Sequence, residues 1–277
     1  MKRVKALVLT GYGLNCDYET HYCMESAGAD CERLHINEVL HRSKEKKGTA
    51  LDPYHILVFC GGFSWGDDHG AGVLMASKLR HHLGEDLIRF LEQNKLVLGI
   101  CNGFQALVNL GMLPAFHNDY TKRTVALTYN DTGNFIDIWV RVRINADSPC
   151  IFTKGLEEME LPVRHGEGKF YAPKDTLNKL LENRQVVMQY ALQNGEPAQG
   201  KWPENPNGSL VDIAGICDPT GRVFGLMPHP EAFNHYTNHP AWAYYQERNR
   251  RKGMGLKPLE PQGMKIFQNA IKFAFAL

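Results

Sequence analysis

The sequence has no long apolar run. None of its apolar stretches approaches the ~20 residues that a membrane-spanning helix needs. The basic start, MKRVK, is followed by the apolar run ALVL and then directly by glycine turns. The run ALVL is too short for the apolar core of a secretory signal. We therefore expect neither a membrane anchor nor a secretory signal, and no membrane partner.

The chain also lacks an excess of charge of either sign. Its 277 residues include 31 Lys and Arg against 30 Asp and Glu, which gives a formal net charge of +1. Proteins that bind nucleic acid or anionic membranes by electrostatics carry a basic excess or a basic patch. We therefore expect no nucleic-acid partner.

Paired cysteines are missing as well. The seven cysteines, an odd number, stand at positions 16, 23, 31, 60, 101, 150 and 217, and no two have C-x-x-C spacing. This spacing indicates neither a disulfide framework nor a cysteine zinc site. Three histidines, His229, His235 and His239, lie close together, but no carboxylate or cysteine spacing supports a metal site. We expect free thiols, no metal, and a reducing cytoplasmic location.

Nucleotide-binding motifs are absent too. The phosphate-binding loop G-x-x-x-x-G-K-[ST] does not occur, and no G-x-G-x-x-G opens a helix after the first expected strand. The short HGEG at 165–168 is too small for a phosphate loop. The chain is therefore expected to hold no nucleotide and no cofactor of its own.

What the sequence does contain is an alternation of strands and helices over its first hundred residues. The sequence predicts strands at 4–10, 31–36, 54–62 and 95–100, of which 54–62 is a continuous apolar run, with helices at 16–29 and 72–94. Strands that alternate with helices are typical of a parallel sheet. We predict an α/β fold with an open, mostly parallel sheet and helices on both faces.

The pattern changes after Thr124. Segments 124–131 and 134–144 alternate with period two and are joined by DTGN, which predicts a hairpin between them. Further on we expect strands within 160–172 and 186–192, helices at 174–184 and 264–276, and a hairpin between 212–218 and 222–228. These are antiparallel additions at the sheet edge. We expect a single domain over 1–277, with an insertion at 193–209 and a C-terminal extension at 234–277.

One cysteine stands at a strand-to-helix junction. Gly99-Ile100-Cys101-Asn102-Gly103 has the form G-x-C-x-G, the nucleophile-elbow pattern with sulfur in place of a serine oxygen. Glycines flank the turn because a Cβ would not fit there, and the following helix N-terminus favours a thiolate. A buried core cysteine is the alternative interpretation. The pattern favours a nucleophile.

A cysteine nucleophile needs a base and a group that orients the base. His229 lies between Pro228 and Pro230, two residues before Glu231. A residue before proline is driven to extended backbone, in which positions i and i+2 face the same way. The carboxylate would then fix the imidazole tautomer, as in a catalytic triad. A surface turn is the alternative when this segment is viewed alone.

Acyl chemistry also needs donors for an oxyanion. The backbone N–H of Asn102, directly after the nucleophile, is the first candidate. A second donor is expected from the glycine turn CGGFSWGDDHGAG at 60–72, because the carboxyl ends of parallel strands meet at one edge of the sheet. These glycines could equally be plain turn residues.

Four motifs in order, GGFSWGD, GICNGFQ, NPNGS with DIAGI, and GLMPHPE, resemble one known family. They are similar to the glutaminase subunits of phosphoribosylformylglycinamidine synthase, which are class I (triad) glutamine amidotransferases with a flavodoxin-like fold. The resemblance extends from about Val4 to Phe233.

The resemblance implies an activity. Cys101 would attack the side-chain amide of L-glutamine, ammonia would leave, and the glutamyl thioester would be hydrolysed, with His229 moving protons and Glu231 orienting it. The family places the second oxyanion donor at Gly62 and Phe63. Substrate-binding residues would be Gln105, Arg164, His165 and Gly166.

The resemblance also implies partners. Ammonia would pass to a large synthetase subunit that holds ATP and magnesium and converts formylglycinamide ribonucleotide to formylglycinamidine ribonucleotide in purine biosynthesis. A small third subunit often bridges the two.

This chain departs from the family at SWGDDHGAG, at EPAQGKWPE and in the tail after Phe233, which leaves the partner contacts open. Two other hypotheses stay open: a catalytically silent subunit that senses glutamine or acts as a scaffold, and another cysteine hydrolase on the same elbow fold.

Overall fold

The computed structural model describes residues 3–45, 49–255 and 260–276. The strands are β1 (Lys5–Thr10), β2 (Asp30–His35), β3 (Ile56–Phe59), β4 (Leu96–Ile100), β5 (Ala126–Tyr129), β6 (Ile136–Ile144), β7 (Glu158–His165), β8 (Glu167–Tyr171), β9 (Val186–Ala191), β10 (Ile213–Cys217) and β11 (Val223–Leu226). The α-helices are α1 (Asp17–Ser26), α2 (Ile36–Glu45), α3 (Val73–Glu92), α4 (Asn102–Leu110), α5 (Lys174–Glu182), α6 (Trp242–Arg251) and α7 (Met264–Phe275).

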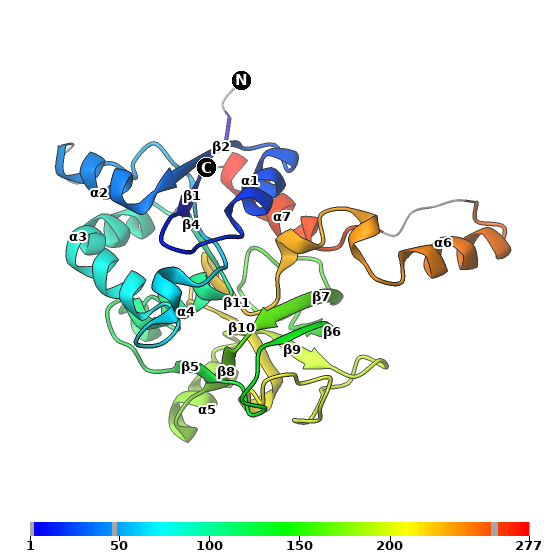
Figure 1. Cartoon of the computed structure of the whole chain (residues 1–277). Helices are drawn as coiled ribbons and strands as arrows, with labels where there is room; N and C mark the ends of the chain where they lie inside the picture. Colours follow the sequence, from blue (N-terminus) through cyan, green and yellow to red (C-terminus); the bar gives the residue numbers. More distant parts are fainter. Residues whose placement is uncertain (1–2, 46–48, 256–259, 277) are drawn as a thin grey trace.

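The first half of the chain forms a parallel sheet in the order β2-β1-β3-β4, and β11 joins it beside β4. All residues of β3, β4 and β11 are buried, as expected for parallel strands that are covered on both faces. Helices α1 and α7 lie on one side of this sheet and α2, α3 and α4 on the other (Figure 1). The predicted α/β class, with helices on both faces, is confirmed.

The second half extends the sheet with antiparallel neighbours. The order continues as β11-β10-β9-β6-β7, so that β10 and β6 run opposite to the other strands of the nine-stranded sheet. The expected hairpin between β10 and β11 is present. Antiparallel additions therefore lie at one edge of a mostly parallel sheet, as predicted.

The predicted hairpin between 124–131 and 134–144 is wrong. A turn does form, with Gly133 N donating to Asn130 O at 2.9 Å. However, β5 pairs with β8 in a separate two-stranded sheet, whereas β6 pairs with β7 and β9. Alternating apolar residues identify a strand and its buried face, but the partner depends on which apolar faces meet in three dimensions.

Two helices were not expected. Helix α2 begins at the residue after β2, so no loop composition marks its start, yet its buried residues Ile36, Val39, Leu40 and Ser43 follow helical spacing. Helix α6 forms within the aromatic and basic segment 234–263, which shows no clean periodicity, and none of its residues is buried.

The insertion at 193–209 contains no helix or strand. It is nevertheless anchored: the backbone amides of Gln199 and Gly200 donate to the Asp212 carboxylate at 2.7 and 2.8 Å. Asn205 and Asn207, near its end, are buried. Much of this segment is therefore part of the folded body.

The extension at 234–277 has two kinds of structure. His239 packs edge-on against Trp139 of β6 and contacts Glu160 of β7 at 3.1 Å, so this part covers the edge strand β7. Helix α6 projects away from the body (Figure 1), and α7 returns to pack against α1. Residues 256–259 and 277 of the extension lie outside the described residues.

The antiparallel half curls back towards the parallel half. His229, just after β11, donates its backbone N–H to Pro162 O of β7 at 2.8 Å, although three strands separate β11 from β7 in the sheet order. Arg164 O, near the end of β7, also lies 3.7 Å from Cys101 Sγ, so the second half of β7 lies against the carboxyl ends of β4 and β11, where ligands bind in α/β folds. Among the described residues, no helix has the length and apolar character to span a membrane.

Candidate active site

Cys101 occupies a strained corner between β4 and α4. Its backbone has φ 50° and ψ −106°, a conformation that costs about 1–3 kcal/mol for a residue with a side chain. A Cβ on Gly103 would lie 1.9 Å from the Phe59 carbonyl oxygen, and one on Gly99 would lie 2.5 Å from the Leu107 side chain. The predicted reason for the flanking glycines is therefore confirmed.

Cys101 as a residue is 4% exposed, and its thiol donates to the Arg164 carbonyl oxygen, with a sulfur–oxygen distance of 3.7 Å. Gln105 is the first residue of α4 whose amide bonds back into the helix, to Cys101 O. The amides of Asn102 and Gly103 therefore form the open, positive end of the helix beside the thiol.

His229 and Glu231 form a buried pair at the end of β11. Nδ1 of His229 lies 2.5 Å from Oε1 of Glu231, and the two side chains are 2% and 1% exposed. The backbone of His229 is extended, with φ −104° and ψ 91°, as predicted. Glu231 follows in a single 3₁₀ turn over Pro230–Ala232, so the turn, and not a continuous extended chain, brings the two groups together.

The charge of Glu231 controls the protonation of His229. Burial of the imidazole opposes its charged form, but the Glu231 carboxylate and then the Cys101 thiolate raise the pKa of His229 well above its ordinary value. His229 Nε2 and Glu231 Oε2 are buried and have no hydrogen-bond partner among the described residues. Nε2 is thus free to exchange a proton with a bound substrate.

The backbone amides of the three expected oxyanion donors, Asn102, Gly62 and Phe63, differ in whether they already have a hydrogen-bond partner. Phe63 N is already committed, since it donates to Gly13 O at 2.9 Å. The Gly62 amide, by contrast, donates no hydrogen bond among the described residues. Gly62 has φ +143°, and a Cβ there would lie 2.7 Å from Leu14 Cα and Asn15 N. Since the Phe63 amide is already bonded, Gly62 and Asn102 are the remaining candidates for oxyanion donors.

Gln105 belongs to a buried polar cluster. Its amide nitrogen donates to Glu167 O, and its oxygen accepts from Asn102 Nδ2 at 3.2 Å. Asn102 Nδ2 also donates to Asp67 Oδ1 at 2.8 Å. Burial, followed by the charge of Glu167, raises the pKa of Asp67 to about 6. Sequence reasoning missed Asp67 and Glu167, although both lie in the glycine-rich segments that it singled out.

His165 is buried. Asn130 Nδ2 donates to backbone oxygens of Asn134 and His165, so its Oδ1 accepts from His165 Nδ1 at 3.1 Å. Nε2 lies 3.5 Å from Asn207 Nδ2. Burial and then the charge of His229 lower the pKa of His165 to about 3, so the ring is neutral. Its side chain is held by asparagines and its backbone borders the site.

Arg164 and Gly166 flank His165. The Arg164 side chain is half exposed and lies 3.6 Å from Asp137, whereas its carbonyl oxygen is the partner of the Cys101 thiol. A Cβ on Gly166 would meet no atom within 4 Å. A cavity of about 260 Å³ opens here; it is lined by Asn15, Cys16, Glu19, Gly62, Phe63, Phe135, Asp137, Arg164 and His229.

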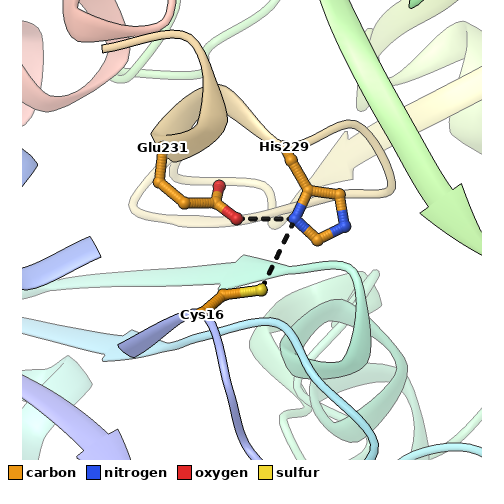
Figure 2. Close-up of side chains that lie close together, drawn as sticks. All are labelled: Cys16, His229 and Glu231. Atoms are coloured by element: carbon orange, nitrogen blue, oxygen red, sulfur yellow. Dashed lines mark hydrogen bonds and ion pairs between the residues drawn. The ribbon is translucent and has the colours of Figure 1, made fainter. Parts of the chain in front are cut away.

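A second thiol lies beside the buried pair. Cys16 Sγ is 4.0 Å from His229 Nδ1, the ring nitrogen that Glu231 also contacts, and it approaches that nitrogen from a different side (Figure 2). Cys16 follows the glycine loop after β1, and the carboxyl end of β1 is at the same sheet edge as Cys101. The position of Cys16 after β1 could have indicated that this cysteine lies near the active site, whereas the spacing of the cysteines in the sequence could not.

The chain matches a family model described as the CobB/CobQ-like glutamine amidotransferase domain over residues 3–274. It is 42% identical over 269 residues to the phosphoribosylformylglycinamidine synthase subunit PurQ of Methanococcus maripaludis strain S2, covering 97% of both chains. It is 44% identical over 274 residues to the subunit PurQ of Dehalococcoides mccartyi, covering 99% of both.

The fold is also similar to solved structures. A chain in the structure of PurLQS from Thermotoga maritima superposes with a TM-score of 0.69 at 27% identity, covering 98% of this chain and 99% of that one. Together with the near full-length family match, this confirms the resemblance drawn from the four motifs. The chain belongs to the family of CobB/CobQ-like glutamine amidotransferase domains.

Proposed function

We propose that this chain hydrolyses L-glutamine to glutamate and ammonia through a thioester on Cys101. The chain would deliver the ammonia to an ATP-dependent synthetase subunit that converts formylglycinamide ribonucleotide to formylglycinamidine ribonucleotide in purine biosynthesis. The observation that carries the proposal is the meeting of a strained, glycine-flanked Cys101 with the buried His229–Glu231 pair at one sheet edge. The near full-length similarity to PurQ subunits supplies the substrate and the pathway.

In the first half-reaction the Cys101 thiolate attacks the side-chain amide carbon of glutamine. The carbonyl oxygen becomes an oxyanion that accepts hydrogen bonds from the amides of Asn102 and Gly62. His229, protonated on Nε2 and held by Glu231, gives that proton to the leaving nitrogen. The C–N bond breaks, ammonia leaves and a glutamyl thioester remains.

In the second half-reaction water attacks the thioester. Neutral His229 accepts a proton from the water at Nε2, and the same two amides stabilise the second tetrahedral intermediate. The C–S bond then breaks, glutamate leaves, and the thiolate and the imidazolium are restored. Glu231 keeps its charge throughout and stabilises the imidazolium each time it forms.

Some of the proposed substrate-binding residues would contact glutamine through their side chains and others through their backbone. We assign Gln105 to the glutamine pocket through its cluster with Asn102 and Glu167. Arg164, His165 and Gly166 would border the pocket chiefly through their backbone, since the His165 ring is held by asparagines and Arg164 O faces the thiol. Of the two donors that the family places in the neighbouring loop, Gly62 has an amide without a partner among the described residues, and Phe63 would only shape the pocket.

The partners are inferred from the relatives. A structure of PurLQS supports association with a large synthetase subunit and a small bridging subunit. ATP and magnesium would be held by the synthetase, and this chain would need no cofactor. All seven cysteines are free thiols, which supports a reducing cytoplasmic location.

We treat residues 1–277 as one glutamine amidotransferase domain, with 193–209 as an insertion and 234–277 as a C-terminal extension. The family match over 3–274 supports this, as does the packing of α7 against α1.

The test is glutamate release from glutamine by the chain, alone and with its synthetase partner. Cys101→Ala should abolish release in both conditions, and a γ-electrophilic glutamine analogue should label Cys101. No turnover in either condition would contradict the proposed function and favour the hypothesis of a catalytically silent subunit that senses glutamine or acts as a scaffold. Turnover of other acyl substrates without labelling by the glutamine analogue would support a different cysteine hydrolase.

A further inference from the structure

We propose that Cys16, His229 and Glu231 form a binding site for one Zn²⁺ ion or a similar thiophilic divalent cation. The bound ion would reversibly block glutamine hydrolysis. The ligand atoms of these three residues all lie within 4.8 Å of one another. Figure 2 shows the Cys16 sulfur and the Glu231 carboxylate approaching the same ring nitrogen of His229 from different sides.

The donor set matches the chemistry of zinc. Thiolate, imidazole and carboxylate are its three usual protein ligands, and three of them leave a fourth tetrahedral position for water. Zinc bonds of about 2.0 Å to nitrogen and oxygen and 2.3 Å to sulfur set the donors about 3.3 to 3.5 Å apart. The observed separations are 2.5 Å for His229–Glu231 and 4.0 Å for His229–Cys16. Changes of about 0.5 to 1 Å in these two separations would therefore bring them to zinc geometry, and the Cys16 and Glu231 donors already lie within 4.8 Å of one another.

The surroundings of the proposed metal site provide a further carboxylate oxygen that could bind the ion and a path by which the ion could enter. Glu231 is 1% exposed, and its Oε2 is buried without a hydrogen-bond partner among the described residues, so the carboxylate has an oxygen in reserve. Cys16 is partly exposed and, together with His229, lines the cavity of about 260 Å³. An ion could therefore reach the site from solvent through this cavity, as a metal site requires.

Binding exchanges protons for the metal. The ion replaces the thiol proton of Cys16 and the proton that His229 shares with Glu231, so two protons pass to solvent as the Zn–S and Zn–N bonds form. No electron transfer is involved, and a chelator reverses the reaction. The metal then holds the imidazole that the proposed function uses for proton transfer. The blocking effect rests on that function, whereas metal binding itself does not.

The binding test uses Co²⁺ as a spectroscopic probe of the full-length chain in the Cys101→Ala background, which removes the nucleophilic thiol as a ligand. One equivalent of Co²⁺ should give a thiolate-to-cobalt charge-transfer band and the visible absorption of a tetrahedral site, and Zn²⁺ should displace it. Adding Cys16→Ala should remove the band. Adding Cys31→Ala, which changes a thiol elsewhere, should leave it intact. A band that survives loss of Cys16 would overturn the site.

The consequence is tested by glutamate release from the chain with intact Cys101. Micromolar Zn²⁺ should inhibit it, and EDTA should restore it. Cys16→Ala should raise the Zn²⁺ concentration for half-inhibition at least tenfold, when each variant is compared with its own metal-free rate. Equal sensitivity of the two proteins would overturn the role of Cys16. Cobalt binding without any loss of hydrolysis would overturn coordination by His229, since an imidazole bound to the metal at Nδ1 keeps its proton on Nε2 and cannot accept another as a base.

Discussion

At the scale of single residues, the contact between Glu231 and His229 is the most informative. The carboxylate is buried, lies 2.5 Å from Nδ1 and raises the pKa of the imidazole, so it selects both the tautomer and the charge of His229. Glu231→Gln keeps the shape and removes the charge. We expect kcat for glutamine hydrolysis to fall by about a hundredfold to ten-thousandfold. Steady-state glutamate release measures this, with the exposed Glu25→Gln as the control.

The same variant should change the pH dependence of hydrolysis. The carboxylate stabilises the imidazolium, so its removal lowers the pKa of His229, and the proton needed by the leaving ammonia is lost at a lower pH. The alkaline limb of kcat/KM should therefore move to lower pH in Glu231→Gln. An unmoved or upward-shifted limb would mean that Glu231 does not control this protonation.

A second residue-scale prediction concerns acid stability. Folding lowers the pKa of His165 from its ordinary 6.5 to about 3, because the ring is buried. Between these values the unfolded chain binds the proton and the folded chain does not, so stability falls as the pH drops below about 6.5. The contribution is about 1.4 kcal/mol per pH unit. His165→Gln should show a correspondingly shallower loss of unfolding free energy in urea titrations between pH 6 and about 4; equal slopes would contradict this account.

At the scale of elements, the junction of β4 and α4 determines where the nucleophile points. Gly103→Ala would drive a methyl group into the backbone oxygen of Phe59, which belongs to a buried strand and cannot move aside. We expect a loss of about 3 kcal/mol or more in unfolding free energy.

Gly84→Ala is the matched control for that substitution. Gly84 lies inside α3, and its Cβ would meet nothing within 4 Å, so alanine should stabilise the protein by about 0.5–1 kcal/mol. Chemical denaturation of both variants measures the difference. A mild effect of Gly103→Ala would show that the elbow is looser than its contacts indicate.

At the scale of the whole molecule, the curl of the sheet brings β7 against the ends of β4 and β11 and so places Arg164 O beside Cys101. The extension at 234–277 covers the edge strand β7 with His239, whereas α6 buries none of its residues. The chemistry thus lies inside the body, separate from the projecting helix.

Because the proposed function places glutamine hydrolysis on this chain and synthesis on the synthetase subunit, the two activities of the assembled complex should be separable by mutation. Cys101→Ala removes only the thiol group and keeps the Cβ on a backbone that glycines already hold in place, so assembly should be unaffected. The complex with the synthetase should lose glutamine-dependent synthesis and keep synthesis supplied with ammonium salts at nearly the wild-type rate. Loss of both activities, with the complex still isolated intact, would contradict the division of labour proposed here.

The sequence by itself determined the α/β class, the elbow at Cys101 and the pairing of His229 with Glu231. These features depend on residues close in the chain: apolar runs of strand length, two glycines around one turn, and a histidine two positions from a carboxylate. Local sterics and hydrophobic patterning act over such distances, which is why they can be predicted from sequence.

Only the tertiary structure decided the partner of β5, the commitment of the Phe63 amide to Gly13, the asparagines that hold His165, and the approach of Cys16 to His229. Each of these joins groups brought together by the order and curl of the sheet. Many pairings satisfy the same alternating pattern, and the packing of buried faces over the whole molecule selects one of them.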